Sequence, residues 1–150
     1  MKKVMIMTNG LYEGGAEKVL VNMVNNLDPK QYDITVATLF DEGVYKESLA
    51  PHIHYKAFMK NSFNGNKYIF RCFSPEFWYQ KVFGKEKFDI VVSYLEGTCA
   101  RVAAGCKNAK KIAWFHSSLS VFQKRKFYRK LCIYDKVVVL TDDCATELKS

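Results

Sequence analysis

Residues 4–24 read VMIMTNGLYEGGAEKVLVNMV, and this stretch decides the fold. An apolar run of strand type comes first, and a polar, turn-rich loop follows over residues 8–13. Gly14 and Gly15 then open an amphipathic helix. Strand, glycine-containing turn and helix in this order are the opening of a parallel α/β domain. The N-terminus of such a helix favours anions, because its unpaired N–H groups and the helix dipole point at the loop.

The glycine pair leaves two interpretations open. The stretch has neither the G-x-G-x-x-G of dinucleotide-binding domains nor the G-x-x-x-x-G-K-[ST] of P-loops. Two adjacent glycines leave no Cβ in the way of a ligand that approaches the backbone. The same pair is equally typical of a simple tight turn before a helix. Taken alone, Gly14 and Gly15 therefore indicate either a turn or a phosphate-binding loop.

Length, charge and cysteine content set the broad class. The 150 residues are enough for one domain with a sizeable core, and the formal net charge of +8 favours anionic partners. The five cysteines include no C-x-x-C pair, so reduced, buried thiols are favoured over disulfides or zinc. The N-terminal apolar run is too short for a signal peptide, and no run approaches the roughly 18 residues of a membrane span. We expect a cytoplasmic protein.

Strand-like and helix-like segments alternate along the chain. The expected strands cover residues 3–8, 33–39, 52–55, 89–95, 111–115 and 136–140. The expected helices cover residues 15–27, 44–50, 75–83, 99–106 and 120–133, and a last helix starts after residue 141 and is cut off at residue 150. Ser74, Thr98 and Thr141 are the expected N-caps of three of these helices. The alternation predicts an α/β fold, with a doubly wound, mostly parallel sheet between two layers of helices.

Polar residues gather where the expected strands end. In a doubly wound sheet the ligand binds at the carboxyl ends of the strands. Those ends carry residues 9–15, 93–97, 116–118 and 141–143. The candidate site residues on this edge are Gly14, Gly15, Ser93, Glu96, His116 and Thr141. Their shared position is a stronger argument for a site than any one motif.

Three stretches resemble the N-terminal half of a GT-B fold retaining glycosyltransferase of family 4. Residues 14–17 (GGAE) resemble that family's glycine-rich loop after the first strand. Residues 89–96 (DIVVSYLE) resemble its fourth strand and the following loop. Residues 112–117 (IAWFHS) resemble the strand that ends in its active-site histidine. The resemblance covers essentially the whole chain and implies a Rossmann-like, acceptor-side domain, one half of a GT-B fold.

The resemblance implies a role for individual residues. His116 would be the active-site histidine and would hydrogen-bond a hydroxyl of the donor sugar. Gly14 and Gly15 would lie against the donor's diphosphate or the transferred sugar. Glu17 would face the acceptor side. The nucleotide-sugar donor is a substrate, so no cofactor and no metal are expected, and the acceptor would be a sugar or a lipid-linked sugar.

The family also has parts that this sequence does not match. Its members carry a second Rossmann-like domain with an Arg/Lys pair that grips the diphosphate and an E-x7-E element that binds the sugar and nucleotide. Residues 1–150 contain neither, so we expect them to be a truncated N-terminal domain. The isolated chain should then be inactive, because neutralising the leaving diphosphate is the largest electrostatic contribution to such a reaction.

Several other polar residues have plainer interpretations. His52 and His54 alternate on a short strand without a third ligand in view, and are expected to be surface residues. Asp142 and Asp143 are expected to be helix-start acids, and the absence of a D-x-D motif removes the ligand set of metal-dependent glycosyltransferases. Glu96 is either a general base or a polar residue at the entry of a helix.

Two stretches are strongly basic. Residues 56–87 hold seven Lys/Arg among many aromatics, and residues 107–130 hold eight Lys/Arg and no acid. Each stretch is either a solvated face over a buried apolar stripe or a surface that binds an anionic bilayer, on the inner face of the cell membrane. No recognition motif accompanies the charge, so nucleic acid is not an expected partner.

Three functions are compatible with the sequence. The first is the N-terminal domain of a nucleotide-sugar-dependent hexosyltransferase that builds a bacterial surface polysaccharide or glycolipid. The second is a stand-alone, membrane-associated Rossmann-like binding module. The third is a fragment of a GT-B sugar-nucleotide epimerase. The resemblance favours the first.

Overall fold

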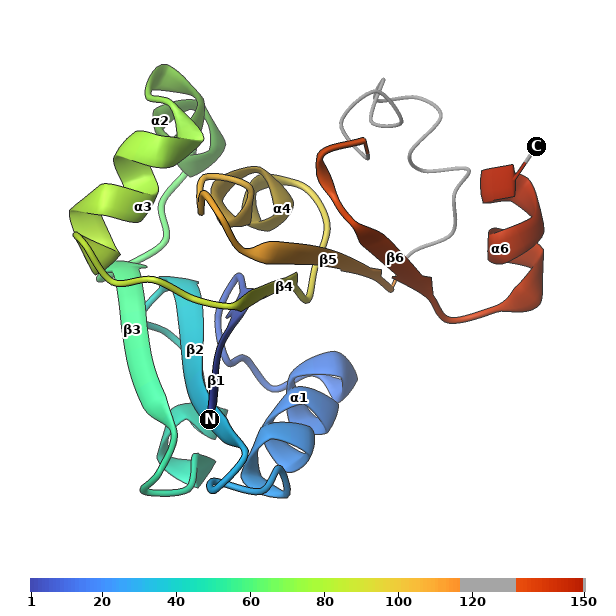
Figure 1. Cartoon of the computed structure of the whole chain (residues 1–150). Coiled ribbons are helices and arrows are strands. Elements are labelled where there is room, and N and C mark those ends of the chain that lie inside the picture. The colour runs from blue at the N-terminus through green and yellow to red at the C-terminus, as the bar shows by residue number, and fades with distance from the viewer. Residues whose placement is uncertain (117–131, 150) are drawn as a thin grey trace.

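The computed structural model describes residues 1–116 and 132–149. Its centre is a six-stranded sheet in which all neighbouring strands are parallel (Figure 1). The strands are β1 (Lys2–Thr8), β2 (Tyr32–Phe40), β3 (His54–Met59), β4 (Ile90–Ser93), β5 (Lys110–Phe115) and β6 (Lys136–Val139). Their order across the sheet is β3-β2-β1-β4-β5-β6. The expected doubly wound parallel sheet is confirmed.

Helices cover both faces of this sheet, which gives the expected three-layer α/β/α architecture (Figure 1). They are α1 (Gly15–Asn25), the 3₁₀ helix η1 (Val44–Ser48), α2 (Asn66–Cys72), α3 (Pro75–Phe83), α4 (Thr98–Ala103) and α6 (Asp142–Lys149). Helix α1 packs on one face, and α3 and α4 pack on the other. The layers place all strand carboxyl ends on one edge, since every described strand runs the same way.

The central strand β1 explains why both faces are covered. Val4 and Ile6 belong to the core on the α1 face, where Leu20 of α1 is fully buried. Met5 and Met7 alternate with them and belong to the core on the α3–α4 face. A strand that is buried on both faces gives a continuous apolar run in the sequence, as residues 4–7 do.

Two of the three expected helix caps are confirmed. The Ser74 hydroxyl accepts the N–H of Phe77 at 3.2 Å, and α3 then ends before Gly84. The Thr141 hydroxyl accepts the N–H of Cys144 at 3.3 Å, at the start of α6. The expected Thr98 cap is wrong: Gly97 is the N-cap of α4, with a positive φ of 80°.

The segment between β2 and α3 differs most from the prediction. The strand expected at 52–55 begins at His54 and continues to Met59, as the edge strand of the sheet. Helix α2 was not expected, because the turn-forming residues 61–66 dominate the local pattern. Phe70 is the only residue of α2 that is buried, so this helix carries almost no amphipathic signal. The expected helix at 120–133 lies largely outside the described residues.

The cysteines behave as small, reduced side chains. All five are free, and Cys99 and Cys106 are buried. Burial raises the pKa of the Cys99 thiol to about 12, and this thiol donates a hydrogen bond to the carbonyl oxygen of Met7. Among the described residues, no helix is long and apolar enough to cross a membrane.

Candidate active site

The candidate site lies at the topological switch point of the sheet. From β1 the chain passes to β2 and β3 on one side, and β4 then pairs with β1 on the other side. Met7 of β1 is in register with Ser93 of β4, and Ser93 is in register with Ala113 of β5. The loops that leave these three strands therefore meet, at the place where doubly wound sheets bind ligands.

The glycine pair opens the first turn of α1. Gly14 is the N-cap and Gly15 the first helical residue. The first hydrogen bond of the helix joins the N–H of Lys18 to the carbonyl oxygen of Gly14 at 3.1 Å. The N–H groups of Gly15, Ala16 and Glu17 therefore have no acceptor within the helix. A Cβ at Gly15 would meet no atom within 4 Å, so the first turn is open to a ligand on this side.

Glu17 occupies the other side of the glycine pair. A Cβ at Gly14 would lie only 2.2 Å from Glu17 Oε2, which shows that this carboxylate folds back over Gly14. Burial raises the pKa of Tyr94, and the charge of Glu17 raises it further, so Glu17 lies near that phenol. A carboxylate here repels a phosphate and accepts from a hydroxyl. The geometry therefore divides the turn into an open, anion-favouring side at Gly15 and an acidic side at Glu17.

The β1–α1 loop is held by the loop after β2. Gly43 has φ of +117°, and a Cβ there would lie 2.0 Å from the backbone of Leu11. The N–H of Leu11 donates to the carbonyl oxygen of Glu42, and the N–H of Tyr45 donates to the carbonyl oxygen of Leu11. The Tyr12 hydroxyl donates to the Glu42 carboxylate at 2.8 Å. These contacts fix the loop that presents the helix N-terminus.

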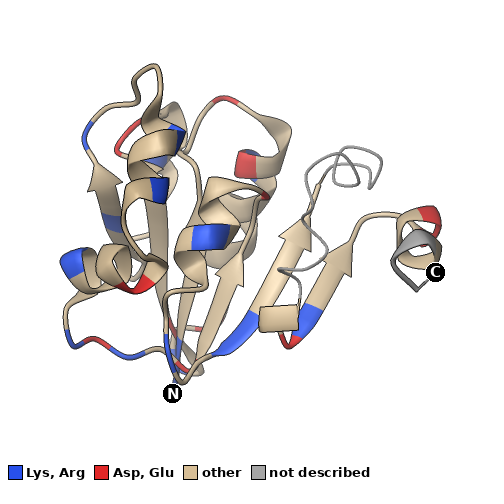
Figure 2. Ribbon diagram, turned by 90° about the horizontal axis from the view of Figure 1, so that it is seen from above, with Lys and Arg blue, Asp and Glu red and all other residues tan. Residues whose placement is uncertain are grey.

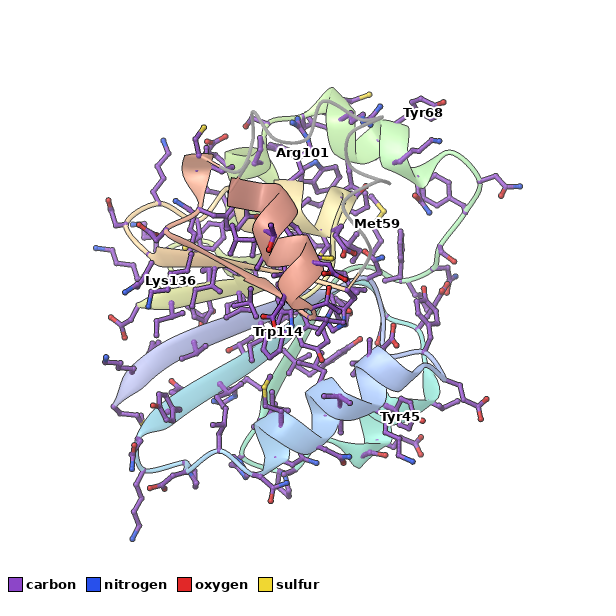
Figure 3. The ribbon with its side chains drawn as sticks, turned by 90° about the vertical axis from the view of Figure 1, so that its right-hand side faces the viewer. Tyr45, Met59, Tyr68, Arg101, Trp114 and Lys136 are labelled. Carbon is purple, nitrogen blue, oxygen red and sulfur yellow. The ribbon has the colours of Figure 1, made fainter. Side chains whose placement is uncertain are left out.

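Three aromatic rings form a stack at the ends of β4 and β5. The His116 ring lies 4.6 Å from the Tyr94 ring and 6.1 Å from the Trp114 ring, centroid to centroid. Trp114 and His116 are two residues apart, so their side chains leave β5 on the same face. That face is the α1 face, where Trp114 packs against the core (Figure 3). The stack therefore places His116 on the same side of the sheet as the glycine pair.

Buried polar atoms without a partner gather at this edge. Within residues 1–116 and 132–149, four buried side-chain polar atoms have no hydrogen-bond partner: Thr8 Oγ1, Tyr94 Oη, Trp114 Nε1 and His116 Nε2. All four lie at or near the carboxyl ends of β1, β4 and β5. Buried polar groups in native proteins are nearly always paired, so such a cluster indicates a place for a polar ligand.

The remaining candidate residues have structural contacts. Glu96 Oε1 accepts the backbone N–H of His116 at 2.5 Å, so Glu96 lies in the site and holds its histidine. Ser93 is buried, and its hydroxyl donates to the carbonyl oxygen of Leu95 at 2.7 Å. Thr141 caps α6 beyond the edge strand β6. Of the predicted site residues, the structure therefore gathers the glycine pair, Glu17, Glu96 and His116, while Ser93 and Thr141 shape the backbone.

Sequence reasoning missed Tyr94, Trp114 and Thr8. Each was treated as part of a strand or of the apolar core. The spacing of Trp114 and His116 was a usable signal, because an i, i+2 pair at a strand end shares one face. Nothing in the sequence could show that Tyr94 packs on His116, since that contact joins neighbouring strands.

No metal site is found in the part of the chain that the structure describes. Its His, Cys, Asp and Glu residues form no group of three that could hold an ion. His54 is largely exposed, and its Nε2 lies 3.2 Å from the carboxylate of Asp33. This placement confirms His54 as a surface residue.

Comparison with known families agrees with this geometry. The model of Glycosyltransferase Family 4 matches residues 13–150, from the glycine-rich turn to the last helix. The chain belongs to glycosyltransferase family 4. The match makes this a glycosyltransferase-type domain, and its parallel sheet is the Rossmann-like half of a GT-B fold. No curated protein sequence matches the chain.

Proposed function

We propose that this family 4 chain is the acceptor-side, N-terminal domain of a retaining hexosyltransferase that uses a nucleotide-sugar donor. The observation that carries the proposal is the buried, unpartnered Nε2 of His116, stacked on Tyr94 on the same sheet face as the open first turn of α1. This pairing offers a hydrogen-bonding group for a sugar hydroxyl and a positive helix end for a diphosphate.

Each part of the site has a distinct role in the proposal. His116 Nε2 hydrogen-bonds a hydroxyl of the donor sugar and so positions the sugar over the switch point. The N–H groups at Gly15 face the donor diphosphate. Glu17 accepts from a hydroxyl of the acceptor, because its carboxylate closes the other side of the turn to phosphate. No metal or cofactor is needed for these contacts.

The helix end cannot neutralise the leaving diphosphate alone. It carries only about half an elementary charge. In the proposal a second, donor-binding domain supplies the cations, and closure of the two domains brings His116 onto the donor. The 150 residues by themselves then turn over donor at a negligible rate.

The biological setting is the finer part of the proposal. We place the enzyme on the cytoplasmic face of a bacterial membrane, where it would extend a surface polysaccharide or glycolipid on a lipid-linked acceptor. The net charge of +8 supports an anionic partner of this kind, and family membership supports the transferase activity.

The test uses the complete enzyme, with donor consumption and product structure as readouts. His116→Ala is compared with His52→Ala, which removes an exposed histidine outside the candidate site. We expect His116→Ala to lower kcat/KM by about 10²-fold or more, as loss of a positioned polar group at a reacting centre does, and His52→Ala to leave it unchanged. Equal turnover of the two variants would overturn the assignment of His116. A product that is an epimerised nucleotide sugar would overturn the transferase.

A further inference from the structure

The helices α2 and α3 carry a surface of exposed apolar side chains. Of the twelve exposed large apolar residues among those described, five lie within residues 63–77. They are Phe63, Tyr68, Ile69, Phe73 and Phe77, with exposures of 38–59%. We call these five residues the α2–α3 surface. Exposed apolar groups are ordinary when scattered singly, but a gathered set marks an interaction site.

The rings of this surface are held in place by the fold. Phe73 and Phe77 stack with their centroids 4.5 Å apart, and both rings meet the buried Trp78. The side chain of Arg101 on α4 donates to the carbonyl oxygen of Phe73 at 3.2 Å. The surface is therefore a fixed array rather than a set of loose side chains, although most of its area faces water.

Basic residues accompany the α2–α3 surface. Between residues 60 and 84 the chain has four basic residues, Lys60, Lys67, Arg71 and Lys81, and one acid, Glu76. Figure 2 shows Lys and Arg in blue on the helices that face the viewer in that view. Lys67 lies over the Tyr68 ring at 5.3 Å, so cation and ring are presented together.

A cavity of about 370 Å³ adjoins this surface, between α2 and α4. Its cationic lining consists of Lys67, Arg71 and Arg101, and its apolar lining includes Ala104 and Tyr134. Tyr68 and Arg101 lie on the same upper side of the molecule in Figure 3. A pocket with cations at its mouth and apolar walls fits a group with an anionic head and an apolar stem.

We propose that the α2–α3 surface docks the protein on an anionic lipid bilayer, with a lipid phosphate in the cavity between α2 and α4. Aromatic rings and basic side chains together are the composition of interfacial membrane sites. A second copy of the chain fits poorly, because a two-fold contact would bring the cations of one copy onto those of the other. The inference rests on the proposed function only in giving a lipid-linked acceptor a route to the site.

The test is co-sedimentation of the 150-residue chain with vesicles, which does not depend on turnover. We expect binding to vesicles of phosphatidylcholine with about one-third phosphatidylglycerol, weak binding to pure phosphatidylcholine, and loss of most binding at high salt. Failure here leaves the proposed transferase intact, and failure of His116→Ala leaves the bilayer site intact.

Matched variants locate the surface. Lys67→Gln with Arg71→Gln should lower the partition coefficient by more than tenfold, since each basic residue near an anionic surface contributes roughly fivefold. The control is Lys2→Gln with Lys30→Gln, which removes the same charge elsewhere on the exposed surface. Tyr68→Ser should weaken binding severalfold, whereas Val44→Ser, at a similarly exposed apolar residue, should not.

Three results would overturn the proposal. One is equal binding to charged and uncharged vesicles. Another is a loss of binding in the control pair as large as in the Lys67 and Arg71 pair. The third is self-association in sedimentation velocity that Tyr68→Ser abolishes, because this would assign the surface to a second copy. Circular dichroism of each variant confirms that a loss of binding is not a loss of fold.

Discussion

The carboxylate of Glu96 accepts the backbone N–H of His116, with 2.5 Å between Oε1 and N. This bond ties the loop after β4 to the end of β5 and fixes the backbone of the candidate catalytic histidine. Tyr94 and Trp114 fix its ring by contact. Glu96 is therefore a positioning residue, since it acts on the site through His116.

Removing the Glu96 carboxylate should loosen His116. For Glu96→Ala we expect the free energy of unfolding to fall by about 1–3 kcal/mol, because a partly buried N–H loses its charged acceptor. In the complete enzyme kcat should fall more than KM rises. Glu96→Gln, which keeps an acceptor oxygen, should restore most of both quantities. Urea unfolding and steady-state kinetics measure these effects, with the exposed Glu47→Ala as control. If Gln and Ala behave alike, the hydrogen bond does not position the histidine.

Gly15 should respond to a methyl group in opposite ways in stability and in binding. Its φ is not positive and a Cβ there meets no atom within 4 Å, so Gly15→Ala should stabilise the fold by about 0.4–1 kcal/mol. The same methyl stands over the first turn of α1 and should raise KM for the nucleotide sugar.

The neighbouring Gly14 provides the comparison for Gly15→Ala. In Gly14→Ala the new Cβ would meet the Glu17 carboxylate, which must turn away, so the gain in stability should be smaller. Thermal melts of both variants and donor titration of the complete enzyme provide the measurements. An unchanged KM in Gly15→Ala would show that the donor does not approach this turn.

The Tyr94 hydroxyl should be dispensable for the fold. It is buried without a hydrogen-bond partner among the described residues. Tyr94→Phe removes an unsatisfied polar group, so stability should stay the same or rise by up to about 1 kcal/mol. If the hydroxyl belongs to the site, kcat/KM should nevertheless fall. Urea unfolding and kinetics on one preparation separate the two effects, and a loss of stability equal to the loss of activity would contradict this role.

Tyr55 should make the protein less stable in alkali. Burial and a hydrogen bond to the Asp41 carboxylate raise the pKa of Tyr55 to about 12. Above a pH of about 10 the unfolded chain loses this proton while the folded chain keeps it. The stabilising contribution is therefore complete below about pH 10 and declines as the pH rises towards 12. Urea midpoints across this range should decline less steeply in Tyr55→Phe, with Tyr68→Phe as the control. Parallel curves for Tyr55→Phe and wild type would exclude this residue.

Prediction from sequence succeeded where one local pattern determines one element. The apolar run at 4–7, the Ser74 cap and the Gly84 stop each act within a few residues of chain, and each lies where it was expected. It failed at α2, where a left-handed Gly65 starts a helix that buries only Phe70. Such a helix has no periodic signal, because its surroundings rather than its own pattern hold it in place.

The candidate site shows the same division. His116, the glycine pair and Glu96 could be chosen because they follow strands whose carboxyl ends must share an edge. The hydrogen bond from His116 to Glu96 and the contact with Tyr94 could not be predicted, since they depend on the register of β4 against β5.

The sequence by itself determined the alternation of strands and helices, and hence a parallel sheet with one functional edge. Hydrophobic periodicity and turn chemistry are local properties that are written residue by residue. Only the tertiary structure decided which polar groups on that edge remain unpaired, because pairing depends on contacts between segments far apart in the chain. It gave Ser93 and Thr141 backbone partners, and it left His116 Nε2 and the Tyr94 hydroxyl buried without any.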